Sequence, residues 1–164
     1  MTVLYHATTL QNAHYIIDSG MLRVSRVKYP TYGNFVSFTR SYHFAKSWAS
    51  TQANQSKTRI IFAFDRDALK TRYRIHQYNY PYHLGKQVER NPEDYEDPDD
   101  MNAVMSIVNG PNRRHVAEEI ITKNVPLKPF LSGVFCIPGT DDADTTPISD
   151  WCDQNSVPFI VDRR

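Results

Sequence analysis

The sequence is poor in cysteine, has no long apolar run and carries almost no net charge. Its two cysteines, Cys136 and Cys152, are too few for a disulfide scaffold and lack metal-site spacing, which favours a reducing compartment. No apolar run approaches the length of a membrane span and the N-terminus shows no signal-peptide pattern, so we expect a cytoplasmic protein with no membrane partner. The formal charge of +1 gives no global footprint of a nucleic-acid-binding protein, although a local basic patch is compatible with it.

Metal-ligand patterns are also absent. The histidines beyond His6 are scattered without the spacing that zinc ligands need, and they stand at His14, His43, His76, His83 and His115. We therefore predict no metal site.

The composition is that of an ordinary globular protein. Hydrophobic residues make up 40% of the 164 residues and charged residues 23%. This length fits one domain with a real core, so we assign residues 1–164 to a single domain.

Hydrophobic patterns predict more strands than helices. The opening strand 2–6 leads into a helix over 8–20, with Thr8 and Gln11 as a capping box and Gly20 as its C-terminal cap. Residues 81–115 are mostly loop, with a short helix around 101–108. The further predicted strands are 34–40, 59–65, 73–80, 118–123, 129–137 and 157–161, and the further helices 41–50, capped by Ser41, 66–72 and 148–155. This pattern favours an α+β fold with a mixed or antiparallel sheet packed as two layers.

Three polar groups stand at the ends or edges of predicted strands, where binding sites are usually built. They are His6, the group Ser37, Thr39 and Arg40, and the pair Glu118 and Glu119. Each alone has a structural explanation, such as a hydrogen-bonded boundary histidine or a row of surface charges. Their order along the chain strengthens a functional interpretation.

That order resembles the ADP-ribosyltransferase superfamily. The stretch "LYHATT" followed by "IIDSGML" is similar to the opening of its histidine-type members, "FVSFTRS" to the second-strand motif of small bacterial and phage relatives, and "EEIIT" to the glutamate motif. The resemblance covers roughly residues 3–137 and includes "IIFAFDRDAL" and "YRIHQYNYPY" between the motifs. It implies split mixed or antiparallel sheets with N-terminal helices flanking an NAD cleft.

The resemblance also implies roles in binding NAD. The family's histidine, here His6, hydrogen-bonds the NAD ribose, and the backbone of Ala7 holds the nicotinamide amide. Ser37 would support the catalytic glutamate or the ribose, Tyr42 would stack on the nicotinamide ring, and Arg40 would pair with the pyrophosphate. The implied cofactor-binding set is His6, Ala7, Ser37, Thr39, Arg40 and Tyr42. The histidine-type members carry a tyrosine in this second region, and Tyr42 is the candidate.

The implied catalytic residues are Glu119, Ser37 and His6. Glu119 directly precedes the aliphatic run, as the family's glutamate does, and Glu118 is the exclusive alternative because adjacent strand residues face opposite ways. Loss of nicotinamide from NAD leaves an oxocarbenium-like sugar, which a carboxylate stabilises while accepting a proton from the nucleophile. This is the chemistry of a glycosyl-transferring enzyme.

Several alternatives stay open. The macromolecular acceptor is a protein or a nucleic acid, and the sequence does not choose between them. The chain also fits a non-catalytic binder of the same fold, for example a phage-encoded inhibitor of a host factor acting in the host cytoplasm. An RNA 2'-phosphotransferase ranks lower because its basic phosphate-binding residues are not clear. The acidic segment 92–100 is most simply a solvated surface, with an acceptor or metal site as the minority interpretation.

Overall fold

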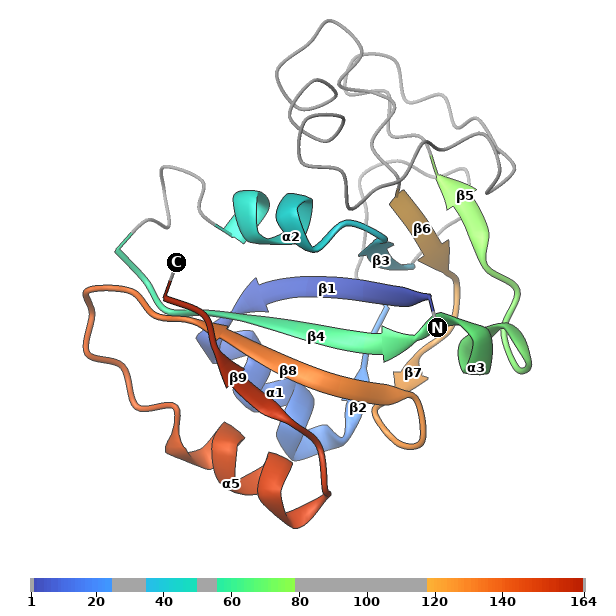
Figure 1. Ribbon diagram of the computed structural model, residues 1–164. Helices are drawn as coiled ribbons and strands as arrows, with labels where there is room; N and C mark the ends of the chain where they lie inside the picture. Colours follow the sequence, from blue (N-terminus) through green and yellow to red (C-terminus); the bar gives the residue numbers. More distant parts are fainter. Residues whose placement is uncertain (1, 25–34, 50–55, 79–117, 164) are drawn as a thin grey trace, which may run out of the picture.

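The computed structural model describes residues 2–24, 35–49, 56–78 and 118–163. The predicted loop 81–115, its short helix, the acidic segment 92–100 and the last residues of the predicted strand 73–80 lie outside these ranges. Among the described residues, seven strands form one sheet in the order β5-β6-β3-β1-β4-β8-β9, and β2 pairs with β7 in a small second sheet (Figure 1). The strands are β1 (Val3–Thr9), β2 (Met21–Leu22), β3 (Val36–Thr39), β4 (Arg59–Asp65), β5 (His76–Tyr78), β6 (Glu118–Ile121), β7 (Val125–Pro126), β8 (Leu131–Ile137) and β9 (Phe159–Val161).

The large sheet is antiparallel except at one edge, where β8 and β9 run parallel. Strand β4 lies near its middle, between β1 and β8, and six of its seven residues are buried. This explains its near-continuous apolar sequence, since a strand covered on both faces has no solvent side. The fold is α+β with a mixed, mostly antiparallel sheet, as the sequence predicts.

Helix α1 (Leu10–Ser19) begins later than the capping-box prediction. The Thr9 side chain caps it by accepting a hydrogen bond from the backbone N of Asn12 at 3.1 Å, so the prediction that Thr8 caps it was wrong. Strand β1 continues through Thr9, which pairs with Arg59. The predicted C-terminal cap is confirmed: Gly20 has a φ of 69°, the left-handed conformation that glycine adopts without strain.

The other helices are α2 (Tyr42–Ala49), α3 (Arg66–Lys70) and α5 (Thr146–Gln154). The Ser41 hydroxyl accepts from the backbone N of Phe44 at 3.1 Å, which confirms its capping role, and Asp65 caps α3 in the same way through Ala68. Helices α1 and α5 lie on one face of the sheet and α2 on the other (Figure 1). Helices therefore cover both faces, one layer more than the expected two.

Candidate active site

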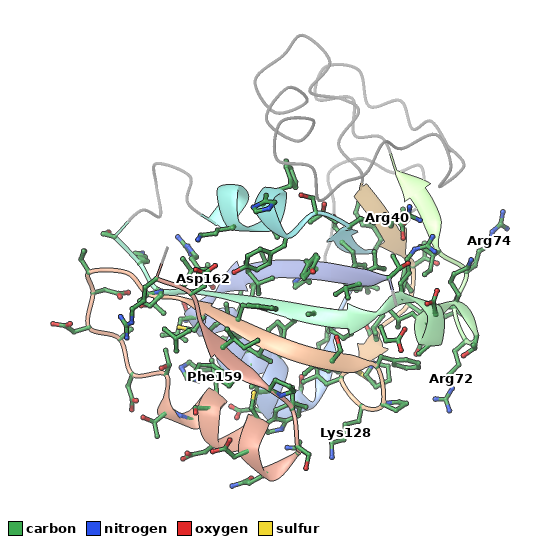
Figure 2. All side chains as sticks on the ribbon, in the orientation of Figure 1. Arg40, Arg72, Arg74, Lys128, Phe159 and Asp162 are labelled. Atoms are coloured by element: carbon green, nitrogen blue, oxygen red, sulfur yellow. The ribbon has the colours of Figure 1, made fainter. Side chains whose placement is uncertain are left out.

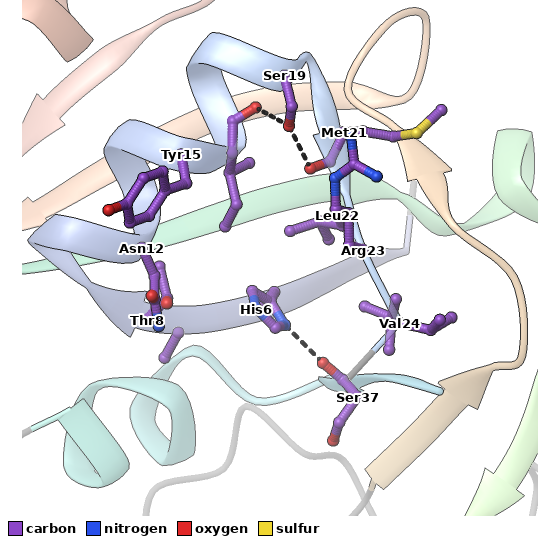
Figure 3. Close-up of a pocket in the computed structure, with 13 residues that line it drawn as sticks. His6, Thr8, Asn12, Tyr15, Ser19, Met21, Leu22, Arg23, Val24 and Ser37 are labelled. Carbon is purple, nitrogen blue, oxygen red and sulfur yellow. Dashed lines mark hydrogen bonds between the residues drawn. The ribbon is translucent and has the colours of Figure 1, made fainter. Parts of the chain in front are cut away.

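His6 stands in the central strand β1 with a defined tautomer. Its Nδ1 atom lies 2.8 Å from the carbonyl oxygen of Ser37, as Figure 3 shows. A carbonyl oxygen only accepts, so Nδ1 carries the proton and donates. Burial lowers the pKa of His6, and the hydrogen bond to Ser37 opposes this with a smaller effect. The ring is therefore neutral near pH 7, and its Nε2 atom is left as a hydrogen-bond acceptor.

A pocket of about 460 Å³ opens beside this histidine (Figure 3). The strand β1 contributes His6, Ala7 and Thr8, helix α1 contributes one face including Asn12, and the segment from Met21 to Val24 forms another wall. Among the lining residues that the structure describes, none is a carboxylate and Arg23 is the formally charged side chain. The described wall of the pocket thus combines apolar surface, a few hydrogen-bonding groups and the cation Arg23, which suits an anionic nucleotide.

Glu119 is held by two arginines. Nε of Arg40 lies 2.7 Å from its Oε1 atom, and Nε of Arg66 lies 2.8 Å from its Oε2 atom. The glutamate side chain is fully buried, while the exposed fractions of Arg40 and Arg66 are 13% and 7%. Charge-assisted hydrogen bonds on both oxygens compensate a carboxylate that would otherwise be very costly to bury.

The register of the strands places His6 and Glu119 on one face of the sheet. Pairing of Tyr5 with Thr39 sets His6 opposite Phe38, and Phe38 in turn pairs with Glu119. Paired residues share a face, so the Phe38 ring, whose centroid lies 6.0 Å from the His6 ring, stands between the two. Two strand spacings put the backbones of His6 and Glu119 about 10 Å apart.

Ser37 meets the site through its backbone. Its neighbour Phe38 faces the His6 side of the sheet, so by alternation the Ser37 side chain faces the other side. Figure 3 shows the carbonyl oxygen of Ser37 aimed at His6 and the hydroxyl directed away. The structure therefore brings together His6, Ala7 and the carbonyl of Ser37. The side chain of Glu118 lies outside what the structure describes.

Tyr42 lies on the opposite face from His6. Its ring packs against Tyr5 and Phe135 at centroid distances of 5.5 and 4.8 Å, and its hydroxyl donates to Asp162 at 2.5 Å. Lys46 reaches the same carboxylate oxygen of Asp162 at 3.1 Å. The structure thus does not bring Tyr42 to the pocket.

Thr39 and Arg40 also have protein partners. The Thr39 hydroxyl accepts from the backbone N of Ser41, and the threonine is buried. Arg40 binds Glu119. Arg66, Arg23 and Asn12 are the residues that sequence reasoning missed, and only Arg66 left a local signal: a charged residue directly after a buried strand.

Among the described residues, no group of three His, Cys, Asp or Glu side chains could hold a metal ion. No helix in the described ranges is long and apolar enough to cross a membrane.

No protein-family model and no curated protein matches the sequence. Solved structures do match over nearly the whole chain. The DarT protein of Thermus sp. 2.9 in complex with NAD+ has a TM-score of 0.59 at 12% identity, over 99% of this chain and 96% of that one. The chain has the ADP-ribosyltransferase fold of DarT.

Two further DarT structures agree. The complex with carba-NAD+ has a TM-score of 0.58 at 14% identity, over 99% of this chain and 95% of that one. The complex with ADP-ribosylated ssDNA has a TM-score of 0.60 at 12% identity, over 99% of this chain and 94% of that one. The predicted fold is thus confirmed, and at these identities the likeness to DarT concerns the fold alone.

Proposed function

We propose that this protein is an NAD-dependent ADP-ribosyltransferase whose acceptor is a nucleic acid, with single-stranded DNA as the first candidate. The observation that carries the proposal is the pocket beside His6, in the fold of proteins solved with NAD+ and with ADP-ribosylated ssDNA. Fold alone does not fix function, so the argument depends on what the site residues do.

The pocket residues suit NAD as substrate. The Nε2 atom of His6 accepts from a ribose hydroxyl, because its Nδ1 proton is committed to Ser37. The backbone of Ala7, in the pocket wall, holds the nicotinamide amide. Arg23, the cation among the described lining residues, takes the pyrophosphate, whereas Arg40, first assigned that role, is engaged with Glu119.

Glu119 supplies the charge for the chemistry. The glycosidic bond between nicotinamide and ribose C1′ breaks, nicotinamide leaves as a neutral base, and a nucleophilic atom of the acceptor bonds to C1′ and loses its proton. A carboxylate on the His6 face stabilises the positive charge that develops on the sugar and accepts that proton. Of its two partners Arg40 is the more exposed, so it is the one that yields Oε1 to the sugar while Arg66 keeps Oε2 in place.

A second candidate function is a non-catalytic binder of the same fold. The full burial of Glu119 and its two ion pairs favour this alternative, because such contacts suit a glutamate with a structural role. The two candidates differ in whether nicotinamide is ever released.

The deciding experiment incubates the protein with NAD labelled on the adenylate phosphate. Single-stranded DNA, single-stranded RNA and a bacterial lysate serve as separate acceptors. We expect label on the DNA together with stoichiometric nicotinamide release. Label on RNA or on a lysate protein would contradict the proposed acceptor but would support the proposed ADP-ribosyltransferase activity. If no arm shows label transfer or nicotinamide release, the non-catalytic binder is the better explanation.

A further inference from the structure

A group of exposed cations surrounds helix α3 and the turn before β8. We call Lys70, Arg72, Arg74 and Lys128 the basic ridge; all four are exposed. Figure 2 shows Arg72, Arg74 and Lys128 on the same side of the molecule, extending away from the ribbon. The guanidinium of Arg72 lies 5.6 Å from the centroid of the Phe130 ring, and this contact joins the turn after α3 to the segment that carries Lys128.

The positive charge of the basic ridge is not compensated by carboxylates in the described residues. Within the described residues, none of its four side chains forms a salt bridge. In the segment 66–75, Asp67 is the single acidic residue, against Arg66 and three cations of the ridge. The near-zero net charge of the whole chain therefore hides a local positive surface.

The segment that carries the ridge meets Glu119 at both of its ends. At its start, Arg66 binds Oε2 of Glu119. At its far end it enters β5, where Gln77 pairs with Glu119 in the neighbouring strand β6. Between these points lie Lys70, Arg72 and Arg74, so a polyanion bound there would lie beside the candidate catalytic carboxylate.

We propose that the basic ridge binds the phosphate backbone of a single-stranded nucleic acid and leads it to Glu119. This proposal rests on the proposed function and says where on the protein the nucleic-acid acceptor binds. A single strand is preferred to a duplex because, where the modified atom belongs to a base, that base must lie outside the stack. Exposed arginines and lysines without ion pairs are the groups that single-strand-binding proteins use for the backbone.

The test measures binding without catalysis. Fluorescence anisotropy of a labelled single-stranded DNA gives the affinity of the full chain, without NAD, between about 50 and 200 mM salt. We expect Arg72→Gln/Arg74→Gln to bind more weakly and to reduce the salt slope by about 1.4, since each lost phosphate contact on a single strand removes about 0.7. Glutamine keeps much of the side-chain stem at two exposed positions, so the variant should fold.

The matched control is Lys57→Gln/Arg163→Gln. It removes the same charge from two exposed sites, one shortly before β4 and one shortly after β9, and should keep the wild-type slope. The ridge proposal is overturned if the ridge variant keeps the wild-type affinity and slope, or if wild type binds poly-glutamate as tightly as DNA. Nicotinamide release is measured in parallel on wild type. If nicotinamide release is absent, the proposed enzymatic activity is contradicted. The salt dependence of DNA binding tests the ridge proposal independently of that result.

Discussion

The Nε atom of Arg66 lies 2.8 Å from Oε2 of Glu119, and this contact joins the start of α3, directly after β4, to β6, a strand that does not neighbour β4 in the sheet. Arg66 is the first residue of α3, where its backbone N also donates to the carbonyl of Thr2 at 3.0 Å. The arginine is therefore fixed at its backbone as well as at its side chain. A carboxylate held by such a residue has a defined orientation before any substrate arrives.

Replacement of Glu119 by Gln should separate binding from turnover. Nicotinamide release should fall about a hundredfold or more, the usual scale for one preorganised electrostatic group, while NAD still raises the thermal midpoint. Loss of turnover with binding retained marks an interaction made mainly in the transition state. The variant should also be less stable, by about 3–5 kcal/mol, because two buried guanidinium groups lose their anion. Steady-state kinetics, NAD-dependent melting and denaturant unfolding measure these three effects.

Glu118→Gln is the control, with the same charge change one residue away, and should retain activity. Glu119→Asp keeps the charge and should recover more of the stability than of the rate. A dead Glu118→Gln with an active Glu119→Gln would move the catalytic role by one residue. Full activity in both would contradict a carboxylate mechanism.

Arg66→Ala should lower kcat far more than it changes KM for NAD, because Arg66 contacts Glu119 and does not line the pocket beside His6. Added guanidinium should restore part of the rate by occupying the space left by the side chain. Arg66→Lys restores the charge with a different donor geometry and should be intermediate. If the role of Arg66 is purely structural, added guanidinium will not restore kcat. The rates are measured at a temperature where the variant is folded.

His6 predicts a pH dependence of stability. Its pKa is lowered below the ordinary value of 6.5 by burial, so in acid the unfolded chain takes up the proton before the folded one does. The contribution of neutral His6 is complete above pH 6.5 and is lost as the pH falls through the lower, folded-state pKa. The stability advantage of wild type over His6→Gln should therefore shrink below pH 6.5. Unfolding free energies of both proteins across this range measure it, and a constant difference would contradict the prediction.

Asp162→Asn should destabilise the fold without affecting NAD use. It weakens the contacts of Asp162 with Tyr42 and Lys46, on the face away from the pocket. We expect a loss of about 3 kcal/mol, at the low end for a buried ion pair because Lys46 is 24% exposed. Denaturant unfolding measures this. An NAD midpoint shift that disappears in the folded variant would show that the two faces are coupled.

Local patterns predicted the elements well where a short stretch determines them. The strand 59–65 and the glycine cap at Gly20 are of this kind. The end of β1 was mispredicted because Thr9 pairs with Arg59 across the sheet, and this tertiary pairing prevails over the local capping signal. Strand β5 is shorter than predicted at its start: residues 73–75 are alternating in sequence yet lie outside any strand.

The site was predicted in part. The motif order indicated His6 and Glu119, and register places both on one face. Arg66 was missed because its partner lies 53 residues further along the chain, and no local pattern records a contact of that range. Tyr42 was misplaced relative to the pocket because a strand–helix motif does not say which face of the sheet the helix covers.

Strand β6 fits between two strands that precede it in the chain, β3 and β5. During synthesis on the ribosome, β5 and the β3 edge that faces away from β1 would therefore lack this partner until residues 118–121 emerge. Until that point Arg40 and Arg66 would also lack the Glu119 carboxylate that they bind in the folded protein. The candidate catalytic centre is thus completed late, when β6 adds to β3 and provides the edge on which β5 pairs.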